Sequence, residues 1–477
     1  MKCSTPVGTT DTEESMKNIR SVALACIVAL FAAIVAQAQT FDTIFNFDGT
    51  NGESAFLGTQ GLDGNLYGTT AGGGLYRGGE IFGITTAGTL VGAHSFCPDL
   101  PACANGDYPF GAPLLASDGN FYGSTSYGGT NNTGTIYKIT PSGKLTTLYN
   151  SPSTVNGTSG PWVQGVNGNL YGEVGTTIYS ISPAGVYTTV YNFSGIEANG
   201  LVLGPNGNLF GTTSYGGRFG NGMFFMLTPT GKLTAIYNFR TSDLFSPSKL
   251  VLASNGNFYG TSFYGGANGG GTVFELTPTG QFRVLYTFCS QANCADGAVP
   301  SFGVVQGTDG NLYGITTMGG TGGAAFCPLY CGTIFQITTS GVLTTLYNFC
   351  SQDQCADGLE PQYPLMQATD GNFYGATFQG GTSGPTGYGT IYRLSMGLAP
   401  FVRTNPTFGN PGRTIGILGN NLTGATAVSF NGTPATFTVV SDTFIKATVP
   451  MGATSGTIQV TTPSGTLDSN VSFQVLP

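Results

Sequence analysis

The stretch DGNLYGTT, residues 63–70, returns throughout most of the chain. The other copies are DGNFYGST (118–125), NGNLYGEV (167–174), NGNLFGTT (206–213), NGNFYGTS (255–262), DGNLYGIT (309–316) and DGNFYGAT (370–377). Each copy opens with Asp-Gly or Asn-Gly, the pairs that favour tight hairpin turns. β-Branched and aromatic residues follow, so the phrase predicts a turn leading into a strand, repeated seven times.

The seven turns are predicted to be two-residue hairpin turns, in which both central residues have a positive φ. Their first position alternates between aspartate and asparagine: Asp63, Asp118, Asn167, Asn206, Asn255, Asp309 and Asp370. Because the charge varies while the turn residue type is kept, the turn is not expected to need a carboxylate. Calcium would need the carboxylates more consistently, so the repeat is interpreted as architectural.

Three further short apolar segments accompany each copy, which makes four strands per repeat. Examples are the run APLLAS (112–117) before the phrase and the segments GTIYKIT (134–140) and KLTTLYN (144–150) after it. Four strands in a unit of about 50 residues is typical of a blade of a β-propeller. An open β-solenoid is the alternative.

The two ends of the repeat region favour a closed ring. The segment FDTIFNF (41–47) is of the type that elsewhere follows a strand such as GTIYRLS (389–395), and that last strand has no follower of its own. Pairing these two segments uses both loose ends and removes exposed sheet edges. We therefore predict an all-β fold: a seven-bladed β-propeller over residues 39–395.

Residues 1–38 are predicted to be a leader with a secretory signal peptide. Lys17 and Arg20 precede an apolar run (22–35), and Ala36-Gln37-Ala38 offers a cleavage site before Gln39. Translation is expected to begin at Met16, and a lipoprotein site at Cys26 is the alternative. The apolar run is short for a membrane span, so no transmembrane segment is expected after cleavage. The protein is expected to be secreted or associated with the cell surface.

Cysteine spacing agrees with export. Eight cysteines remain after the leader, each close to another: Cys97 and Cys103, Cys289 and Cys294, Cys327 and Cys331, Cys350 and Cys355. Such pairs indicate four local disulfides formed in an oxidising compartment. A zinc site is the alternative, but it needs four converging ligands, and the chain has one histidine, His94. No metal and no cofactor are expected.

The candidate binding residues lie in the variable loops. In an antiparallel unit the variable connections share one face of the ring, and loops on a rigid scaffold often carry function. The candidates are Tyr127, Tyr215, Tyr264, Asp107, Asp296 and Asp357. The tyrosines could stack on sugar rings, although packing between blades is favoured for them. The aspartates could hold a cation or a polar ligand, although plain turns are favoured.

The sequence does not decide whether the protein is an enzyme, and the favoured interpretation is that it is not one. His94 has no nucleophile motif around it, and Glu80, Glu173 and Glu275 stand in non-equivalent contexts. Carboxylates could still meet at the ring's channel, as glycoside hydrolysis requires. Binding to nucleic acid is not expected, because the formal net charge is -8 and the chain has no basic run.

The sequence changes character after residue 395. A short segment (396–402) is interpreted as a linker, and residues 403–477 contain short alternating strands separated by Pro, Gly and Asn-Gly turns. The runs ILGNNL (417–422), VSFNG (428–432) and ATVP (447–450) resemble an IPT/TIG domain. That resemblance implies an immunoglobulin-like sandwich, a fold found in cell-surface receptors, bacterial surface proteins and some transcription factors. Residues 396–477 have three cations, which does not support the DNA-binding branch.

The repeats resemble the GloVer tandem repeat of exported bacterial proteins, which is marked by a G-x-T-x-Y-G-G phrase. GSTSYGG (123–129), GTTSYGG (211–217) and GTSFYGG (260–266) carry it here. The resemblance implies export, but the family's activity is unknown. Its members often end in an anchoring signal, whereas VSFQVLP (471–477) has neither an apolar tail nor a basic cluster, so release is expected as much as attachment.

Three functions are weighed on this basis. The favoured one is an exported, non-catalytic binding or adhesion protein whose disulfide-stapled loop face holds a glycan or a surface protein. The alternatives are an extracellular carbohydrate-active enzyme, a hydrolase or lyase, with carboxylates near the channel, and a purely structural cell-surface protein.

Overall fold

The computed structural model describes residues 39–152, 159–322 and 331–477. The predicted leader, with its cleavage site and Cys26, lies outside the described residues. The described chain is all-β, with three short 3-10 turns, η1 (Pro205–Gly207), η2 (Ala292–Cys294) and η3 (Asp353–Cys355).

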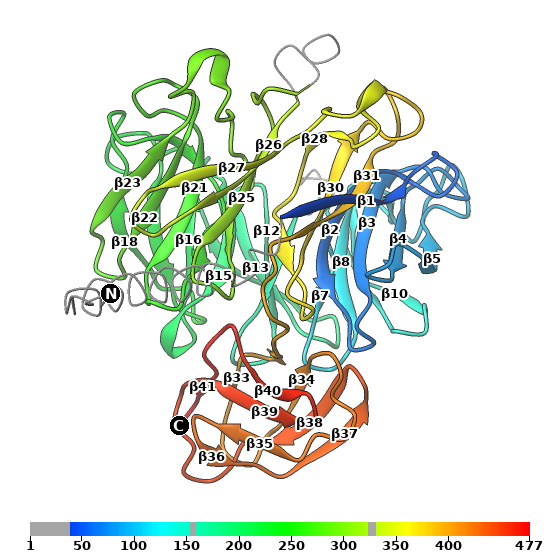
Figure 1. The fold of residues 1–477 in the computed structure, drawn as a ribbon, viewed down its shortest axis with the longest axis vertical. Helices are drawn as coiled ribbons and strands as arrows, with labels where there is room; N and C mark the ends of the chain where they lie inside the picture. Colours follow the sequence, from blue (N-terminus) through cyan, green and yellow to red (C-terminus); the bar gives the residue numbers. More distant parts are fainter. Residues whose placement is uncertain (1–38, 153–158, 323–330) are drawn as a thin grey trace, which may run out of the picture. The chain divides into compact units, whose positions relative to one another are not determined.

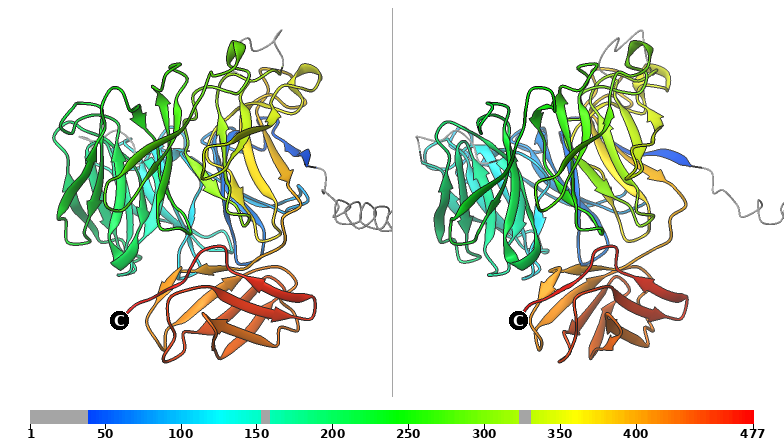
Figure 2. Two further views of the ribbon diagram at one scale, coloured as in Figure 1. Left: turned by 60° about the vertical axis from the view of Figure 1, so that its left-hand side comes forward. Right: turned by 90° about the vertical axis from the view of Figure 1, so that its left-hand side faces the viewer.

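Residues 40–395 form seven antiparallel, blade-like sheets (Figures 1 and 2). The first has β2 (Glu53–Gln60), β3 (Leu66–Gly72), β4 (Glu80–Ile84) and β5 (Leu90–Ser95). The second has β6 (Asp107–Pro109), β7 (Leu114–Leu115), β8 (Phe121–Tyr127), β9 (Thr135–Ile139) and β10 (Leu145–Asn150). The third has β11 (Ser159–Gln164), β12 (Leu170–Val174), β13 (Thr177–Ile181) and β14 (Tyr187–Asn192). The fourth has β15 (Ala198–Leu203), β16 (Leu209–Thr213), β17 (Met223–Leu227) and β18 (Leu233–Asn238).

The remaining three sheets follow the same order. The fifth has β19 (Phe245–Pro247), β20 (Val251–Leu252), β21 (Phe258–Tyr264), β22 (Thr272–Leu276) and β23 (Phe282–Thr287). The sixth has β24 (Val304–Gln306), β25 (Leu312–Thr316), β26 (Thr333–Ile337) and β27 (Leu343–Asn348). The seventh has β28 (Leu359–Pro361), β29 (Met366–Gln367), β30 (Phe373–Gln379), β31 (Thr390–Ser395) and, from the start of the described chain, β1 (Thr40–Asn46).

The predicted pairing of the two ends is confirmed. β1 pairs antiparallel with β31, with Thr40 opposite Ser395 and Asn46 opposite Thr390. Phe41 stacks on Tyr347 of the sixth sheet with the ring centroids 3.6 Å apart. The seventh sheet, in turn, packs against the first through β30 and β2. The last repeat is therefore completed by the first strand, and the contacts between sheets run in a closed circuit.

The hydrophobic core lies between neighbouring sheets. In one cluster, Ala116 and Tyr122 of the second sheet pack with Leu170 and Tyr179 of the third, and all four side chains are fully buried. Comparable clusters join the fourth and fifth sheets and the fifth and sixth. This arrangement follows from strands that are apolar on both faces, because each sheet is covered on both sides.

The repeated turns differ from the predicted two-residue hairpins. In the first repeat, the Gly61 N–H donates to the Asn65 carbonyl at 2.8 Å, so the loop has three residues, 62–64. Gly64 has a φ of +81°, but Asp63 is not among the residues with positive φ. Such a loop is a type I turn followed by one left-handed residue, so only the glycine needs a positive φ. Asn206, with a φ of 61°, is the exception among the seven first positions.

The C-terminal segment forms sheets of its own. One contains β32 (Arg403–Asn405), β34 (Thr414–Leu418), β38 (Phe444–Thr448) and β37 (Phe437–Ser441). Another contains β36 (Thr433–Pro434), β35 (Ala427–Phe430), β39 (Ile458–Thr462) and β40 (Gly465–Asp468). The short strands β33 (Phe408–Gly409) and β41 (Gln474–Val475) pair in parallel. Buried side chains of both four-stranded sheets, such as Ile445 and Val460, share one hydrophobic core.

Hydrogen bonds join this segment to the turn side of the repeat region. The Thr443 hydroxyl donates to the Leu62 carbonyl at 2.8 Å, beside the first repeated turn. The Asn420 side chain donates to the Thr369 hydroxyl at 2.9 Å, beside the last one. The variable loops leave from the opposite ends of the same strands.

Candidate functional site

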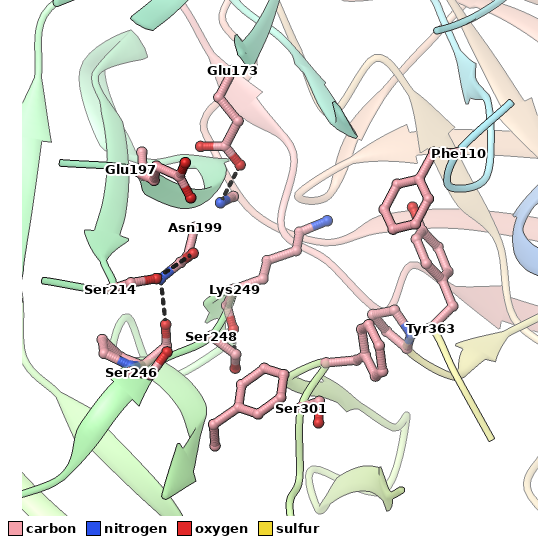
Figure 3. A pocket seen from close by; sticks show the side chains of 16 residues that line it. Phe110, Glu173, Glu197, Asn199, Ser214, Ser246, Ser248, Lys249, Ser301 and Tyr363 are labelled. Carbon is pink, nitrogen blue, oxygen red and sulfur yellow. Dashed lines mark hydrogen bonds between the residues drawn. The ribbon is translucent and has the colours of Figure 1, made fainter. Parts of the chain in front are cut away.

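A cavity of about 290 Å³ lies where the first strands of the sheets converge (Figure 3). Its lining residues come from six sheets, the second to the seventh, so no single repeat builds it. They are Phe110, Glu173, Glu197, Ala198, Asn199, Gly200, Ser214, Ser246, Pro247, Ser248, Lys249, Phe263, Ser301, Phe302, Tyr363 and Pro364. Most stand near the variable-loop ends of their strands, which is the side where a ligand was expected.

Glu173 supplies a buried carboxyl group. It lies near the end of β12, is 7% exposed, and accepts the Gly200 N–H at 2.6 Å. Burial raises its pKa to about 8, against the opposing effects of that hydrogen bond and of Lys249. Near neutral pH this side chain is therefore mostly a neutral carboxylic acid.

Lys249 supplies an amine between β19 and β20. Figure 3 shows it extending between Glu173 on one side and Phe110 and Tyr363 on the other. Burial lowers its pKa to about 8, and the attraction of Glu173 opposes that shift. Within residues 39–152, 159–322 and 331–477, its ammonium makes neither a hydrogen bond nor an ion pair.

The polar wall of the cavity is preformed by internal hydrogen bonds. The Asn199 amide donates to the Ser214 hydroxyl and to the Pro247 carbonyl, each at 2.7 Å. The Ser248 and Thr261 hydroxyls are bonded to each other at 2.7 Å. These bonds hold loops of the fourth and fifth sheets together before any ligand arrives.

The other wall is aromatic. Phe110, Phe263, Phe302 and Tyr363 line the cavity. Phe56 of the first sheet packs on Phe110 and Tyr363, with ring centroids 4.9 and 5.8 Å apart. Burial raises the pKa of Tyr363 to about 12, so its phenol is neutral at physiological pH. Flat apolar faces and a few polar groups are the usual makeup of a small-ligand site.

The predicted tyrosines lie elsewhere on the loop side. Tyr127, Tyr215 and Tyr264 are 54%, 52% and 51% exposed. The favoured interpretation, packing between blades, is therefore wrong, because half of each side chain faces solvent. The three tyrosines belong to the second, fourth and fifth sheets, and none lines the cavity.

The predicted aspartates differ among themselves. Asp296 is 0% exposed, and its carboxylate accepts bonds from the Tyr286 hydroxyl, the Ser290 N–H and hydroxyl, and the Gln291 N–H. Asp357 is also 0% exposed and accepts the same four bonds from Tyr347, Ser351 and Gln352. Both carboxylates organise their own loops. Asp107 lies in β6, where burial raises its pKa.

Three of the four predicted disulfides are present. They join Cys97 to Cys103, Cys289 to Cys294 and Cys350 to Cys355. The fourth predicted pair, Cys327 and Cys331, includes a residue outside the described ones. Among the described residues, no group of three or more His, Cys, Asp or Glu side chains could hold a metal ion.

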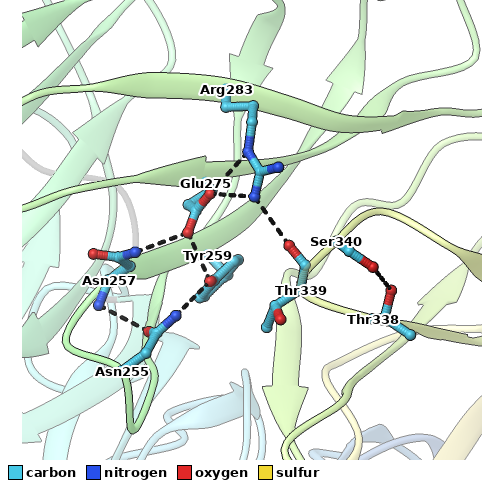
Figure 4. A network of polar contacts seen from close by, with 8 residues as sticks. All are labelled: Asn255, Asn257, Tyr259, Glu275, Arg283, Thr338, Thr339 and Ser340. Atoms are coloured by element: carbon cyan, nitrogen blue, oxygen red, sulfur yellow. Dashed lines mark hydrogen bonds and ion pairs between the residues drawn. The ribbon is translucent and has the colours of Figure 1, made fainter.

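The other ionisable residues named from the sequence lie away from the cavity. The Glu275 carboxylate is bound by Arg283 at 2.6 Å and by Tyr259 and Asn257, each at 2.8 Å (Figure 4). Glu80 accepts a bond from the Ser95 hydroxyl at 2.5 Å. His94 lies in β5, an outer strand, where burial lowers its pKa. Of the three glutamates, the structure brings one, Glu173, to the centre of the ring.

Lys249 and Glu197 were not predicted as site residues. A comparison of the repeats could have identified Lys249, because it differs from the residues at the matched positions. It stands six residues before the first residue of its repeated phrase, where the other repeats carry Leu57, Ala112, Pro161, Gly200, Gly303 and Pro364. Similarly, Glu173 stands where other repeats carry Thr69, Thr212 or Thr261. Charged residues that replace uncharged residues at matched repeat positions mark this site.

The fold and the cavity define a repeat protein of the β-propeller type with a preformed central pocket. The chain belongs to the Gloeobacter/Verrucomicrobia repeat family, whose model matches residues 31–202 and 197–439. This confirms the repeat family predicted from the sequence. No curated protein sequence matches the chain.

Solved structures show the same fold at low sequence identity. A streptogramin B lyase is 17% identical with a TM-score of 0.53, over 75% of this chain and 97% of the lyase. Catalytically inactive virginiamycin B lyase from Staphylococcus aureus, with quinupristin, is 15% identical with a TM-score of 0.52, over 75% and 99%. The extracellular domain of a hybrid two-component system from B. thetaiotaomicron is 11% identical with a TM-score of 0.50, over 92% and 58%. At these identities the likeness concerns the fold alone.

Proposed function

We propose that this protein is an exported, non-catalytic binding protein that holds the end of a glycan in the central cavity. The observation that carries the proposal is the preformed cavity itself, with one polar wall and one aromatic wall. Its volume of about 290 Å³ is just below the usual range for ligand pockets, about 300–1,000 Å³, and therefore suits a small ligand such as one sugar residue. A protein partner would instead need a surface burying about 1,000 Å² or more.

The proposed architecture is a seven-bladed β-propeller over residues 39–395, a linker at 396–402 and an IPT/TIG domain at 403–477. The seven sheets and their closed circuit support the first part. The two C-terminal four-stranded sheets around one core support the second. In this scheme the C-terminal domain serves as a spacer or a second contact.

Export is supported by the local disulfides, which persist in oxidising compartments. A signal peptide in residues 1–38 would deliver the chain there, to act as a secreted or surface-associated protein. Within the described part of the chain, the structure has no helix with the length and apolar character that crossing a membrane requires.

The second candidate is a carbohydrate-active enzyme that uses Glu173 at the channel. The observation that favours it is the pKa of Glu173, which burial raises to about 8, within the range of a general acid. The histidine chemistry of the similar lyase offers no support. The inactive lyase carries a histidine-to-alanine substitution, whereas the one histidine here, His94, lies in an outer strand.

A glycan and polysaccharide array tests the proposal with the chain from Gln39, reading both retained binding and released reducing sugar. Phe263→Ala removes a half-buried aromatic side chain from the cavity wall. Tyr264→Ala is its matched control, because that exposed tyrosine is the next residue and lies outside the cavity. We expect binding without release, and at least a tenfold loss of affinity in F263A alone.

Other outcomes are equally informative. If Y264A loses binding while F263A keeps it, the ligand binds the exposed tyrosine loops and the cavity proposal fails. Release of reducing sugar that stops in Glu173→Gln supports the enzyme instead.

A further inference from the structure

Lys249 is the cationic group of the cavity, and its hydrogen-bonding capacity is unused within the described residues. A lysine ammonium has three donors and no acceptor. Within the described residues none of the three is used, while the neighbouring Asn199, Ser214 and Ser248 side chains are all bonded to protein. The Lys249 side chain is partly buried, and burial without a protein acceptor makes its charged form less stable than it would be in water. A ligand that enters the cavity therefore meets a strong donor that needs an acceptor.

The charges around Lys249 favour an anion with a single charge. The groups that face it are Glu173 from β12, Glu197 from the loop before β15, and Tyr363 from between β28 and β29. Near neutral pH, burial keeps Glu173 mostly protonated and Tyr363 neutral. Glu197 is exposed at the rim and repels a second negative charge. One ammonium thus matches one carboxylate better than a doubly charged phosphate.

The rest of the cavity suits a sugar ring. Phe263 and Phe302 offer aromatic faces on which the C–H face of a sugar can lie. The Glu197 carboxylate and the Ser246 hydroxyl make no side-chain hydrogen bonds within the described chain, so both can bind sugar hydroxyls. The acceptor for Lys249 would then lie beside that side chain, and the sugar hydroxyls would lie beside Glu197 and Ser246.

We infer that the cavity binds the end of a glycan that carries a carboxylate, a uronate sugar, and that Lys249 selects it by pairing with that carboxylate. This inference rests on the proposed function, since it names the class of sugar that the same cavity would take. It assigns Lys249 a role in specificity and no role in bond breaking.

Isothermal titration calorimetry with galacturonate, galactose and galactose 6-phosphate tests the inference. We expect galacturonate to bind at least tenfold more tightly than either of the other two. Lys249→Gln should abolish that preference, while Lys232→Gln, at an exposed lysine outside the cavity, should retain it. A thermal unfolding curve of K249Q shows whether the variant is folded. If it is not, Lys249→Arg replaces it and should keep the preference for the charged sugar.

The pH dependence supplies a second readout. Between pH 7 and 9, Lys249 loses its proton and Glu173 loses its own, since the pKa of each is about 8. Both changes weaken binding of a carboxylate, so galacturonate affinity should fall by at least tenfold over this range. Glu173→Gln should show a shallower fall.

The outcomes separate this inference from the proposed function. Equal affinity for galactose and galacturonate overturns the inference and leaves the glycan-binding function standing. Tighter binding of the sugar phosphate overturns the carboxylate assignment. The absence of binding to all three sugars, together with a silent glycan array, overturns both.

Discussion

Glu173 occupies a repeat position whose side chain links one sheet to the next in several repeats, although the sixth and seventh repeats carry Ile315 and Ala376 there. In the first repeat, the Thr69 hydroxyl donates to the Gly111 carbonyl at 3.0 Å, and in the fourth repeat Thr212 donates to Ser248 at the same distance. Glu173 keeps the equivalent link by accepting the Gly200 N–H. A carboxyl group at this position therefore preserves the link between sheets and adds an ionisable group to the cavity.

Replacing this carboxyl group should change how stability depends on pH. The pKa of Glu173 rises from 4.5 to about 8 on folding, so the folded state holds the proton more tightly. The contribution of Glu173 to the free energy of unfolding is fully present below about pH 4.5 and is lost as pH rises toward 8. Between pH 5 and 8, Glu173 should make the free energy of unfolding of the unmodified chain fall as pH rises. In Glu173→Gln this contribution is absent, so the slope should be smaller by up to ~1.4 kcal/mol per pH unit.

Urea unfolding at pH 5, 6.5 and 8 measures this slope. Glu197→Gln, at an exposed carboxylate of the same cavity, should keep the slope of the unmodified chain. Equal slopes for E173Q and the unmodified chain would mean that Glu173 is ionised when buried.

The first residue of each repeated turn acts through its side chain. Asp118 Oδ1 accepts the Asn120 N–H at 3.0 Å, and Oδ2 accepts the Tyr122 hydroxyl at 2.7 Å. In the third repeat, Asn167 accepts the Asn169 N–H and donates to the Tyr171 hydroxyl instead. Because a phenol both donates and accepts, aspartate and asparagine serve the same turn.

Substitutions at Asp118 should show this equivalence. Asp118→Asn should change the unfolding free energy by less than ~0.5 kcal/mol, whereas Asp118→Ala should lower it by ~1–2 kcal/mol, since the bonds from the Asn120 N–H, the Asn120 side-chain amide and the Tyr122 hydroxyl are all lost. Denaturant titration of both variants compares them. A large loss in D118N would indicate that this turn depends on charge.

At the scale of elements, the stapled loops depend on a buried aspartate as much as on a disulfide. The loop between β23 and β24 contains the disulfide between Cys289 and Cys294 and is organised by Asp296. The loop between β27 and β28 repeats this arrangement with Asp357. The same combination of a disulfide and a buried aspartate thus occurs in two neighbouring repeats, so the effects of equivalent substitutions in the two loops can be compared.

Asp296→Asn and Asp357→Asn should destabilise the protein equally, each by ~2 kcal/mol, because each replaces a buried carboxylate that accepts four hydrogen bonds in its loop. Breaking one short-loop disulfide by a double Cys→Ser change should cost a similar ~2 kcal/mol. Asp99→Asn, at an exposed aspartate, is the control. Thermal unfolding measures all of these variants, and unequal losses at the two aspartates would show that the loops are not equivalent.

At the scale of the whole molecule, the first strand closes the ring. The β1 strand supplies the outer strand of the seventh sheet, and Asp42 forms an ion pair with Arg393 at 2.8 Å. Without β1, the edge of β31 would be unpaired, and such edges promote association.

Deleting residues 40–46 should therefore make the chain associate. Size-exclusion chromatography with light scattering should show dimers or larger species, and a synthetic peptide of residues 40–48 should restore the monomeric profile. A truncated chain with the stability and elution volume of the full chain would contradict the role of β1 in closure.

Much of this architecture could be predicted from sequence because it depends on short-range sequence patterns. The repeated Asp-Gly and Asn-Gly turns, the β-branched strands and the close cysteine pairs depend on neighbours in the chain. The unmatched segments FDTIFNF and GTIYRLS even indicated which strands meet. The turn type was wrong because one left-handed glycine after a type I turn meets the same sequence preference as a two-residue turn.

The candidate site was decided by tertiary structure alone. Glu173 and Lys249 are 76 positions apart in the sequence and meet because the third and fifth sheets converge on one centre. The exposure of Tyr127 and the burial of Asp296 likewise depend on what packs around each loop. Local sequence determined the strands, turns and staples, whereas the pocket and its shifted pKa values arise from burial that only the assembled ring creates.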